Sequence, residues 1–303
     1  MPTLAQLRTL VTVVDAGSFT EAAVRLATSQ SAASHALAAL EREVGGRLVE
    51  RAAPVRATPL GARLLPHARA AVSSADAFTA EVTTVRHRGT VRLAAVPTVC
   101  QGLLPALLHR WSTELPDVQV RVFEGDDDEL EPWLESGTVD AAILVDPVHV
   151  APGARLVARD DMRAVVRTDH PLLGEPAISI EELREDGLLA SAGGCEAQML
   201  RLHEQAGLPY EPAQRVRELA TMVRMVAEGI GVSVMPALGG GLLPDGVTLA
   251  PLSPELTREL VLTGPSRRPW HPLVRALVAA TTDAPVDATL AGGSTRASTT
   301  VAV

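Results

Sequence analysis

Residues 17–51 read GSFTEAAVRLATSQSAASHALAALEREVGGRLVER, and this stretch decides the fold of the N-terminal part of the chain. Apolar residues at helical spacing precede it and stop at Gly17, which ends a first helix. Ser18, followed three residues later by Glu21, predicts a capping box and a short second helix. Ser29 can then cap a third helix. Three short helices joined by tight turns predict a helix-turn-helix.

The third helix has an apolar face and a polar face. The apolar side consists of Ala33, Leu37, Leu40 and Val44. The opposite side carries short hydrogen-bonding side chains near the helix N-terminus, namely Gln30, Ser31, Ser34 and His35. Such a helix can enter the major groove of DNA, where Gln pairs with adenine and Ser or His reaches base edges or phosphates. The alternative is an ordinary solvated face, and the polar pattern alone does not decide between the two.

Residues 48–59 favour the DNA-binding interpretation. They predict a short two-stranded wing that ends at a new helix start near Thr58-Pro59. Arg51 and Arg56 on this wing can contact backbone phosphates. The predicted DNA-binding residues are Ser29, Gln30, Ser31, Ser34, His35, Arg42, Arg51 and Arg56.

A long helix is expected to follow the wing. Its apolar positions step by four and three through Leu64, Ala68, Ala71, Ala75, Phe78, Val82 and Val85. This spacing is typical of a coiled-coil seam, and the small Ala side chains allow close approach of two helices. We therefore expect residues 61–88 to form a linker and dimerisation helix. The alternative is a helix packed on its own domain.

Charge and composition restrict the function classes. Residues 1–88 hold ten Arg and seven acidic residues, a balance of +3, whereas the rest of the chain carries −12, which together give the net charge of −9. Only the N-terminal part therefore suits phosphates. All 27 basic residues are Arg. The absence of Lys excludes sites that need a Walker lysine, a Schiff-base lysine or a Ser-x-x-Lys pair.

The bulk properties fit a protein of the cytoplasm. The sequence shows neither a signal peptide nor an apolar run of membrane-spanning length, so we expect no membrane association. Two cysteines, Cys100 and Cys195, agree with a reducing compartment. The eight His residues are scattered without metal-ligand spacing, and we expect neither a metal nor a cofactor.

The N-terminal segment resembles the DNA-binding segment of LysR-type transcriptional regulators. The residues that carry this resemblance are Gly17–Ala23, Leu26, Ser29–Ser34, Leu40–Glu41, Val44–Gly45, Arg47–Leu48 and Glu50–Arg51. The resemblance implies a homodimer or homotetramer that binds an imperfect inverted repeat in double-stranded promoter DNA. It also implies a small-molecule effector that modulates this binding.

Alternating strand and helix patterns fill the rest of the chain from residue 89, which predicts parallel sheets with crossover helices. This body resembles the family's effector domain, which looks like a two-lobed periplasmic solute-binding protein. The overall prediction is an α/β protein with an N-terminal all-α winged helix-turn-helix. The expected segments are a head over 1–60, the linker over 61–88, lobe one over 89–161 and 265–285, lobe two over 162–264, and a disordered tail over 286–303.

Two helix N-termini, at Pro97–Cys100 in lobe one and at Ser191–Cys195 in lobe two, are expected to face the cleft between the lobes, where ligands of open α/β sheets bind. We expect a small organic anion, a carboxylate, to bridge them, with Thr98 and Ser191 donating hydrogen bonds. The predicted effector-binding residues are Pro97, Thr98, Val99, Cys100, Asp146, Ser191, Ala192, Gly193, Gly194 and Thr221.

Three alternatives remain at this stage. A Cys near each of these helix starts leaves open a thiol- or redox-responsive regulator of the same architecture, or one that needs no effector. A solute-binding protein for transport would leave everything before Gly89 unexplained. An enzyme is disfavoured because residues 231–235, GVSVM, lack the closing Gly of a nucleophile elbow.

Overall fold

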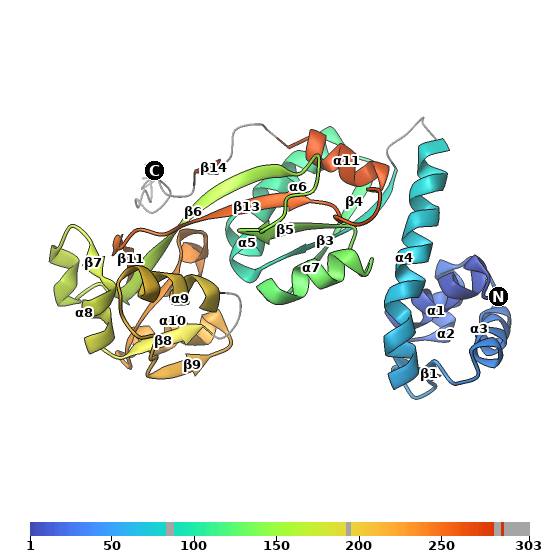
Figure 1. Cartoon of the computed structure of the whole chain (residues 1–303), viewed down its shortest axis with the longest axis horizontal. Coiled ribbons are helices and arrows are strands. Elements are labelled where there is room, and N and C mark those ends of the chain that lie inside the picture. Colours follow the sequence, from blue (N-terminus) through green and yellow to red (C-terminus); the bar gives the residue numbers. More distant parts are fainter. Residues whose placement is uncertain (83–87, 192–194, 282–285, 288–303) are drawn as a thin grey trace, which may run out of the picture.

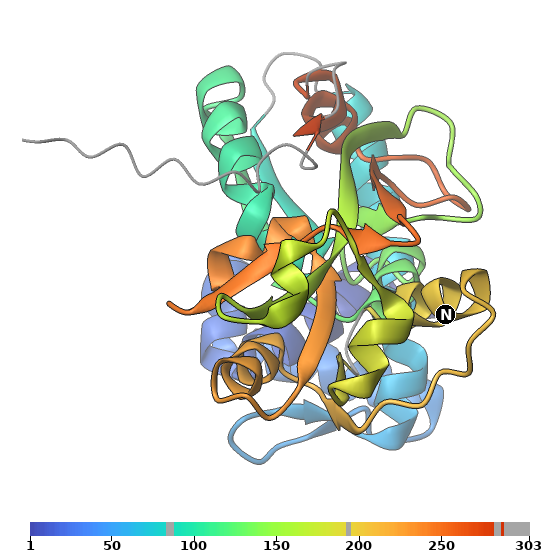
Figure 2. The ribbon, with the colours of Figure 1, turned by 90° about the vertical axis from the view of Figure 1, so that its left-hand side faces the viewer.

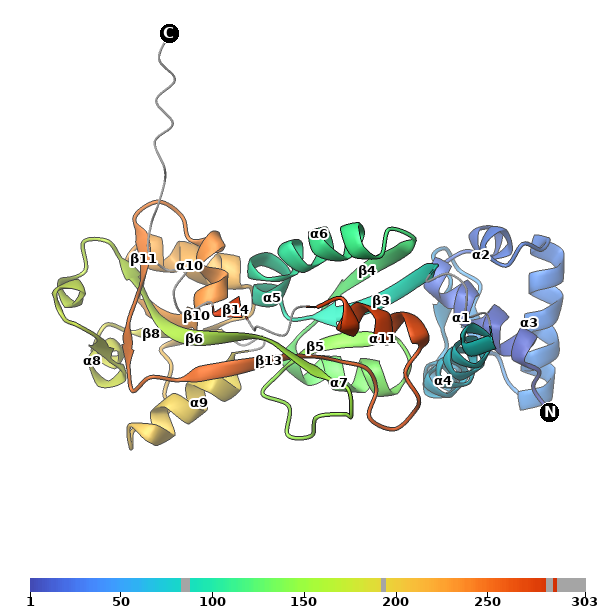
Figure 3. The ribbon, with the colours of Figure 1, turned by 90° about the horizontal axis from the view of Figure 1, so that it is seen from above.

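The computed structural model describes residues 1–82, 88–191, 195–281 and 286–287. Three parts follow one another along the longest axis: a helical head, lobe one of an α/β body, and lobe two (Figures 1 and 3). Figure 2 views the molecule from the lobe-two end. No helix in the described ranges is long and apolar enough to cross a membrane.

The head consists of three helices and a wing. Its elements are α1 (Leu4–Ala16), α2 (Phe19–Arg25), α3 (Gln30–Val44), β1 (Val49–Glu50) and β2 (Arg56–Ala57). Gly17 ends α1 in the left-handed conformation, with φ of 63°, as the sequence predicts. The capping box predicted at Ser18 forms only in part. The Ser18 hydroxyl accepts from the Glu21 N–H, but the Glu21 carboxylate instead accepts from Arg25 Nε at 3.1 Å.

Helix α4 (Pro59–Val82) leaves the wing and runs beside the head (Figure 1). The first part of its predicted seam packs on its own domain, because Ala68 is 2% exposed within the head core. Farther along, Ala71 is exposed and Phe78 is 73% exposed, so this part of the seam remains open. The packing alternative therefore describes the first part of the helix, and the coiled-coil seam stays a prediction for the open part.

Lobe one is built around parallel strands. Its elements are β3 (Gly89–Ala95), α5 (Pro97–Gly102), α6 (Leu104–Glu114), β4 (Val118–Glu124), α7 (Asp127–Glu135), β5 (Ala141–Val145) and the late helix α11 (Pro272–Ala279). Strand β3 pairs in parallel with both β4 and β5. The predicted α/β alternation is thus present. The helix expected after Pro97 is broken into α5 and α6 at Leu103.

Lobe two repeats the parallel arrangement around β8. Its elements are η1 (Pro171–Gly174), β7 (Ile178–Ser179), α8 (Ile180–Glu185), β8 (Leu188–Ser191), α9 (Glu196–Gln205), β9 (Gln214–Val216), α10 (Leu219–Ala227), β10 (Val232–Pro236), η2 (Ala237–Leu242), β11 (Val247–Ala250) and β12 (Leu252–Ser253). Strand β8 pairs in parallel with β9 and β10.

Two long strands join the lobes. Strand β6 (Arg155–Arg167) pairs with β13 (Thr257–Thr263) over its first half and with β10 and β11 over its second half. Strand β13 also pairs with β5, and its Leu260 and Leu262 belong to the lobe-one core. The chain therefore joins the lobe-one sheet at Leu260, a few residues before the return near Gly264 that the sequence predicts.

The expected tail begins with a short strand. Strand β14 (Val286–Asp287) pairs in parallel with β6, so the predicted disorder does not apply to these two residues. The remainder, residues 288–303, lies outside the described residues.

A glycine fixes how α4 meets the wing. A Cβ added at Gly61 would lie 1.9 Å from the Leu48 carbonyl oxygen, and that oxygen already accepts from the Thr58 N–H at 3.0 Å. We expect Gly61→Ala to destabilise the head by about 1–3 kcal/mol through overpacking, as measured by urea unfolding. Gly174→Ala, which would meet nothing within 4 Å, is the control. Equal stability of the two variants would contradict this packing.

Candidate functional site

The polar face of α3 projects from a rigid head. Ser29 caps the helix, its hydroxyl accepting from the Ala32 N–H at 3.1 Å. Ala33, Leu37 and Leu40 are at most 1% exposed and lock the opposite side of α3 into the head. This packing leaves Gln30, Ser31 and His35 exposed, with Ser34 half-buried. The helix therefore presents hydrogen-bonding groups to solvent at its first turns.

The three arginines predicted to contact phosphates are all exposed on the head. Arg56 lies on β2 and is exposed. Arg51, also exposed, places its guanidinium 5.6 Å from the centre of the Phe19 ring, a cation–π distance that orients it beside α2. Arg42 is exposed on α3, where its Nε donates to the Ala38 carbonyl at 3.4 Å. These side chains have the charge and reach for phosphate contacts.

A buried ion pair lies where the two long strands join the lobes. Asp160 on β6 and Arg258 on β13 are directly opposite in the strand pairing, and each has 0% of its surface exposed. Arg258 donates to Asp160 Oδ2 from Nε at 3.1 Å and from Nη2 at 2.7 Å. Burial raises the pKa of the Asp160 carboxyl, whereas the facing guanidinium lowers it.

The ion pair also forms hydrogen bonds with residues of both lobes. Arg258 Nη2 donates to the Thr98 hydroxyl at 2.7 Å, and Thr98 belongs to α5 of lobe one. Asp160 Oδ1 accepts from the Leu238 N–H at 3.1 Å, and Leu238 lies in η2 after the lobe-two strand β10. Because the Thr98 oxygen accepts from Arg258, its own O–H stays available as a donor.

A cavity of about 300 Å³ opens beside this pair. Lobe one, lobe two and the joining strand β13 all contribute to its wall. The lining residues are Val96, Pro97, Thr98, Gln101, Glu124, Gly125, Asp126, Glu129, Cys195, Arg217, Glu218, Leu219, Ala220, Leu242 and Arg258. Arg258 Nη1 is shielded from solvent and has no hydrogen-bond partner among the described residues. A polar group placed in this cavity would therefore meet a hydroxyl donor and a guanidinium.

The structure brings only part of the predicted effector set together. Pro97 and Thr98 line the cavity. Val99 is instead buried in the lobe-one core, and the Cys100 thiol points at the Ala95 carbonyl at 3.6 Å. Ser191 is buried outside the lining, and Ala192, Gly193 and Gly194 lie outside the described residues.

Asp146 and Thr221 also lie off this cavity. Asp146 adopts a positive φ of 43° at the end of β5 and pairs with Arg201 of α9, an ion pair between the lobes. Asp146 lines a second hollow of about 440 Å³, together with Asp127 and Glu196. Thr221 is exposed on α10, one residue beyond the lining stretch.

Sequence patterns did not identify Arg258, the buried guanidinium in the wall of the cavity. Arg258 sits in the segment TRELVLT, where it is followed directly by Glu259, and two adjacent charged residues at the start of a strand resemble ordinary surface positions. No local pattern connects it with Asp160, 98 residues earlier. Glu218 was equally hidden, because an acidic residue before a helix resembles an ordinary solvated position.

The two cysteines are poor thiolates in this structure. Cys195 caps α9 and is 5% exposed, and burial raises the pKa of its thiol. Burial, together with Glu124, raises the pKa of Cys100 to about 11. Among the described residues, no cluster of three or more His, Cys, Asp or Glu side chains could hold a metal ion.

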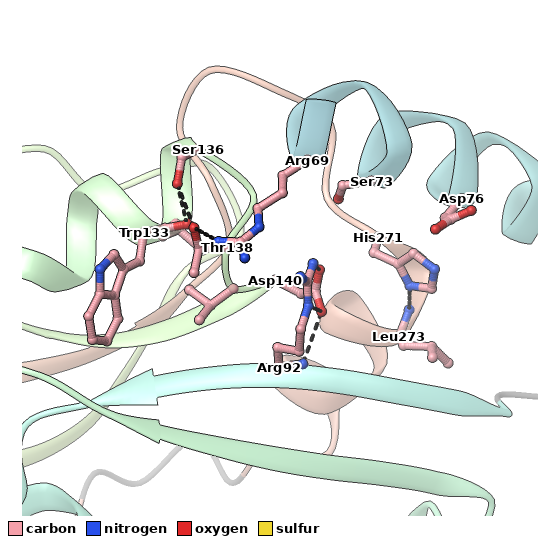
Figure 4. A network of polar contacts seen from close by, with 12 residues as sticks. Arg69, Ser73, Asp76, Arg92, Trp133, Ser136, Thr138, Asp140, His271 and Leu273 are labelled. Carbon is pink, nitrogen blue, oxygen red and sulfur yellow. Dashed lines mark hydrogen bonds and ion pairs between the residues drawn. The ribbon is translucent and has the colours of Figure 1, made fainter. Parts of the chain in front are cut away.

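Polar contacts join α4 to lobe one, as Figure 4 shows. Arg69 on α4 donates to the Thr138 hydroxyl at 2.9 Å and also pairs with Asp15 of α1. From the body, Arg268 donates to the Ser73 hydroxyl on α4 at 2.8 Å. A Cβ added at Gly137, where φ is +74°, would lie 3.2 Å from the Arg69 backbone. This junction gives the body a direct mechanical contact with the head.

Comparisons with known proteins match both parts of the chain. The model described as "Bacterial regulatory helix-turn-helix protein, lysR family" matches residues 4–62, and "LysR substrate binding domain" matches residues 85–285. A "Probable hydrogen peroxide-inducible genes activator" of Mycobacterium avium is 38% identical over 244 residues, 78% of each chain. The "Uncharacterized HTH-type transcriptional regulator YvbU" of Bacillus subtilis is 28% identical over 270 residues, 87% of this chain and 92% of that protein.

Solved structures share the fold. A full-length OxyR variant from Pseudomonas aeruginosa superposes with a TM-score of 0.74 at 23% identity, covering 93% of this chain and 98% of that one. Full-length CbnR in complex with its target DNA superposes with a TM-score of 0.60 at 23% identity, covering 92% and 98%. These similarities confirm the predicted arrangement of a helix-turn-helix head and a two-lobed α/β body.

Asp127 at the start of α7 predicts a pH effect. Burial raises its pKa to about 6. The charge of Arg258 acts in the opposite direction, and those of Asp146 and Asp128 act in the same direction as burial. Since a carboxyl in the unfolded chain titrates near 3.9, this group contributes its full stability below about pH 4 and loses it as the pH rises through 6. We expect Asp127→Asn to melt at a higher temperature than the wild type at pH 8, with a smaller difference at pH 5.

The exposed residue Glu131 on the same helix, which is not among the charges that shift Asp127, supplies the control. Glu131→Gln should show no such dependence. A difference for Asp127→Asn that stays the same at both pH values would contradict the burial of its charge.

Proposed function

The chain belongs to the LysR family of bacterial transcriptional regulators, and from this premise we propose that its head binds an inverted repeat in promoter DNA through α3 while a small effector in the interlobe cavity sets the strength of that binding. The observation that supports the proposal most directly is the position of Arg258. Its side chain joins the two lobes at the hinge and at the same time lines the cavity.

The DNA-binding half rests on the exposed first turns of α3. Gln30 can pair with adenine through its amide, and Ser31 and His35 can reach base edges or phosphates. Arg51 and Arg56 on the wing then neutralise phosphates and set the register of the head on the duplex. CbnR, which shares this fold, has been solved in complex with its target DNA, and this supports the same use of the head here.

Two heads must be held at a defined spacing to bind an inverted repeat. The open face of α4 that contains Ala71 and Phe78 provides an apolar surface for a second copy. We propose that this half of the linker helix forms the dimer seam predicted from the sequence, and that a tetramer is assembled from two such dimers.

The effector part of the proposal follows from thermodynamic linkage between ligand binding and the arrangement of the lobes. A ligand that contacts both lobes stabilises the arrangement in which both contacts form, and it can shift the regulator only by that difference in affinity. The change can reach the head through β6 and β13, lobe one and the junction of Arg69 with Thr138. We assign no catalytic residue, because nothing in this role requires a reaction.

A peroxide-responsive regulator is the second candidate. It is favoured by the 38% identity to the hydrogen peroxide-inducible genes activator of Mycobacterium avium. Burial of Cys195 and the pKa of about 11 for Cys100 oppose it, since the thiolate is the reactive form. The double variant Cys100→Ala/Cys195→Ala separates the candidates, because a thiol sensor would lose its response to peroxide in the DNA-binding assay.

The proposal is tested by genomic footprinting of the purified protein, followed by a screen of organic acids and amino acids for altered operator binding. We expect Gln30→Ala/Ser34→Ala/His35→Ala to lose at least ten-fold in preference for the operator over random duplex. Thr98→Val should keep operator affinity and lose the response to the active compound. A folded triple variant with unchanged selectivity, or a Thr98→Val variant with an unchanged response, would refute the corresponding half of the proposal.

A further inference from the structure

Two carboxylates line the interlobe cavity and have no partner among the residues that the structure describes. Glu124 ends β4 in lobe one, and Glu218 precedes α10 in lobe two. Both are exposed and both line the cavity of about 300 Å³. Within the described ranges neither side chain makes a hydrogen bond or an ion pair, and the Glu218 carboxylate makes no capping bond to α10. The cavity therefore has a free negative group on each lobe.

The remaining charges of the cavity do not neutralise these two. Arg258 is matched by Asp160 inside the protein. Arg217, whose side chain is 78% exposed, approaches Asp126 at 3.7 Å. The fourth lining carboxylate, Glu129, accepts from the Asp126 N–H at 3.0 Å. The lining thus holds four carboxylates and two guanidiniums, and one guanidinium, that of Arg258, is already balanced by Asp160. A simple anion would therefore enter an unfavourable electrostatic field.

The cavity wall also offers hydrogen-bond donors. Arg258 is 0% exposed, its Nη1 lacks a hydrogen-bond partner among the described residues, and the Thr98 hydroxyl beside it keeps its proton to donate. A buried donor without a partner costs free energy, which an acceptor oxygen of a ligand would recover. The lining therefore combines donors at Thr98 and Arg258 with carboxylates at Glu124 and Glu218 that have no partner in the described part of the chain.

We propose that the effector is a zwitterion of the amino-acid class. Its carboxylate accepts from Thr98 and Arg258, and its ammonium group lies between Glu124 and Glu218. The ammonium group links one carboxylate from each lobe and removes the repulsion that otherwise opposes their approach, so this ligand draws the lobes together. The inference rests on the proposed effector function and adds a positive group to the carboxylate expected from the sequence. The volume lies at the lower end of the roughly 300–1,000 Å³ of small-molecule sites.

Matched probes test this on the full-length protein at pH 7.5. The twenty common amino acids are screened by thermal unfolding. Leucine, valine and phenylalanine are then compared by isothermal titration with their des-amino acids (4-methylpentanoate, 3-methylbutanoate and 3-phenylpropionate) and their decarboxylated amines. We expect at least one amino acid to raise the melting temperature. Compounds lacking either group should bind at least ten-fold more weakly than those carrying both.

Charge-removing variants locate the ammonium group. Glu124→Gln and Glu218→Gln should each weaken binding of the active amino acid about ten-fold, whereas Glu255→Gln, an exposed carboxylate outside the lining, should leave it unchanged. Circular dichroism establishes that each variant is folded.

Three results would overturn the zwitterion. These are des-amino acids that bind as tightly as amino acids, unchanged binding by both Gln variants, and the absence of binding by every amino acid. A des-amino acid whose binding depends on Thr98 would refute the zwitterion while supporting an effector in the cleft. No thermal shift by any acid or amino acid, together with no effect in the operator screen, would refute the effector role itself.

Discussion

The structure of the body depends on one buried ion pair, Asp160 with Arg258. Taking two charges out of water is costly, and such a pair persists only when its hydrogen bonds are well formed. Here the carboxylate accepts from the guanidinium at two positions and from the Leu238 N–H, and the guanidinium also donates to Thr98. The two strands that join the lobes are thereby fastened to each other and to one element of each lobe.

This constraint also organises the wall of the interlobe cavity that we propose as the effector site. The Thr98 hydroxyl is fixed by Arg258, so the donor group of lobe one is oriented before any ligand arrives. Lobe two contributes Glu218 and Leu219 from the opposite side of the cavity, and β6 and β13 lie between the two sides. A ligand that contacts both sides therefore acts directly on the hinge. Helix α4 contacts lobe one through the hydrogen bonds of Arg69 and Arg268, which is the route that we propose for the signal to the head.

Patterns that depend on near neighbours could be predicted from the sequence. The caps at Ser29 and Gly17, the buried face of α3 and the alternation of strands and helices all arise from local periodicity and turn chemistry, and the structure contains them. The chain's resemblance to LysR-type regulators was also carried by a contiguous segment, which the matching family models confirm. For the effector cleft, the same reasoning identified Thr98, because it follows a buried strand at the start of a helix.

The rest depended on contacts between distant residues. Asp160 and Arg258 meet only because β6 and β13 are paired, and the same pairing moves the return to lobe one ahead of Gly264. Asp146 does lie at a strand end, as predicted, but its carboxylate forms an ion pair with Arg201 between the lobes. The face of α4 that packs on the head could not be separated from its open face, since Ala68 and Ala71 are the same residue type at equivalent helical spacing.

The most direct test of this account is a double-mutant cycle on the ion pair. It uses urea unfolding of Arg258→Met, Asp160→Asn and the double variant, followed by the fluorescence of the three tryptophans, all of which lie in the body. Each single variant leaves one buried polar group without its partner. We therefore expect each to lower the free energy of unfolding by about 3–5 kcal/mol, and the double variant to lower it by clearly less than the sum of the two. Small single effects that add to within about 0.5 kcal/mol would show that the hinge does not depend on this pair.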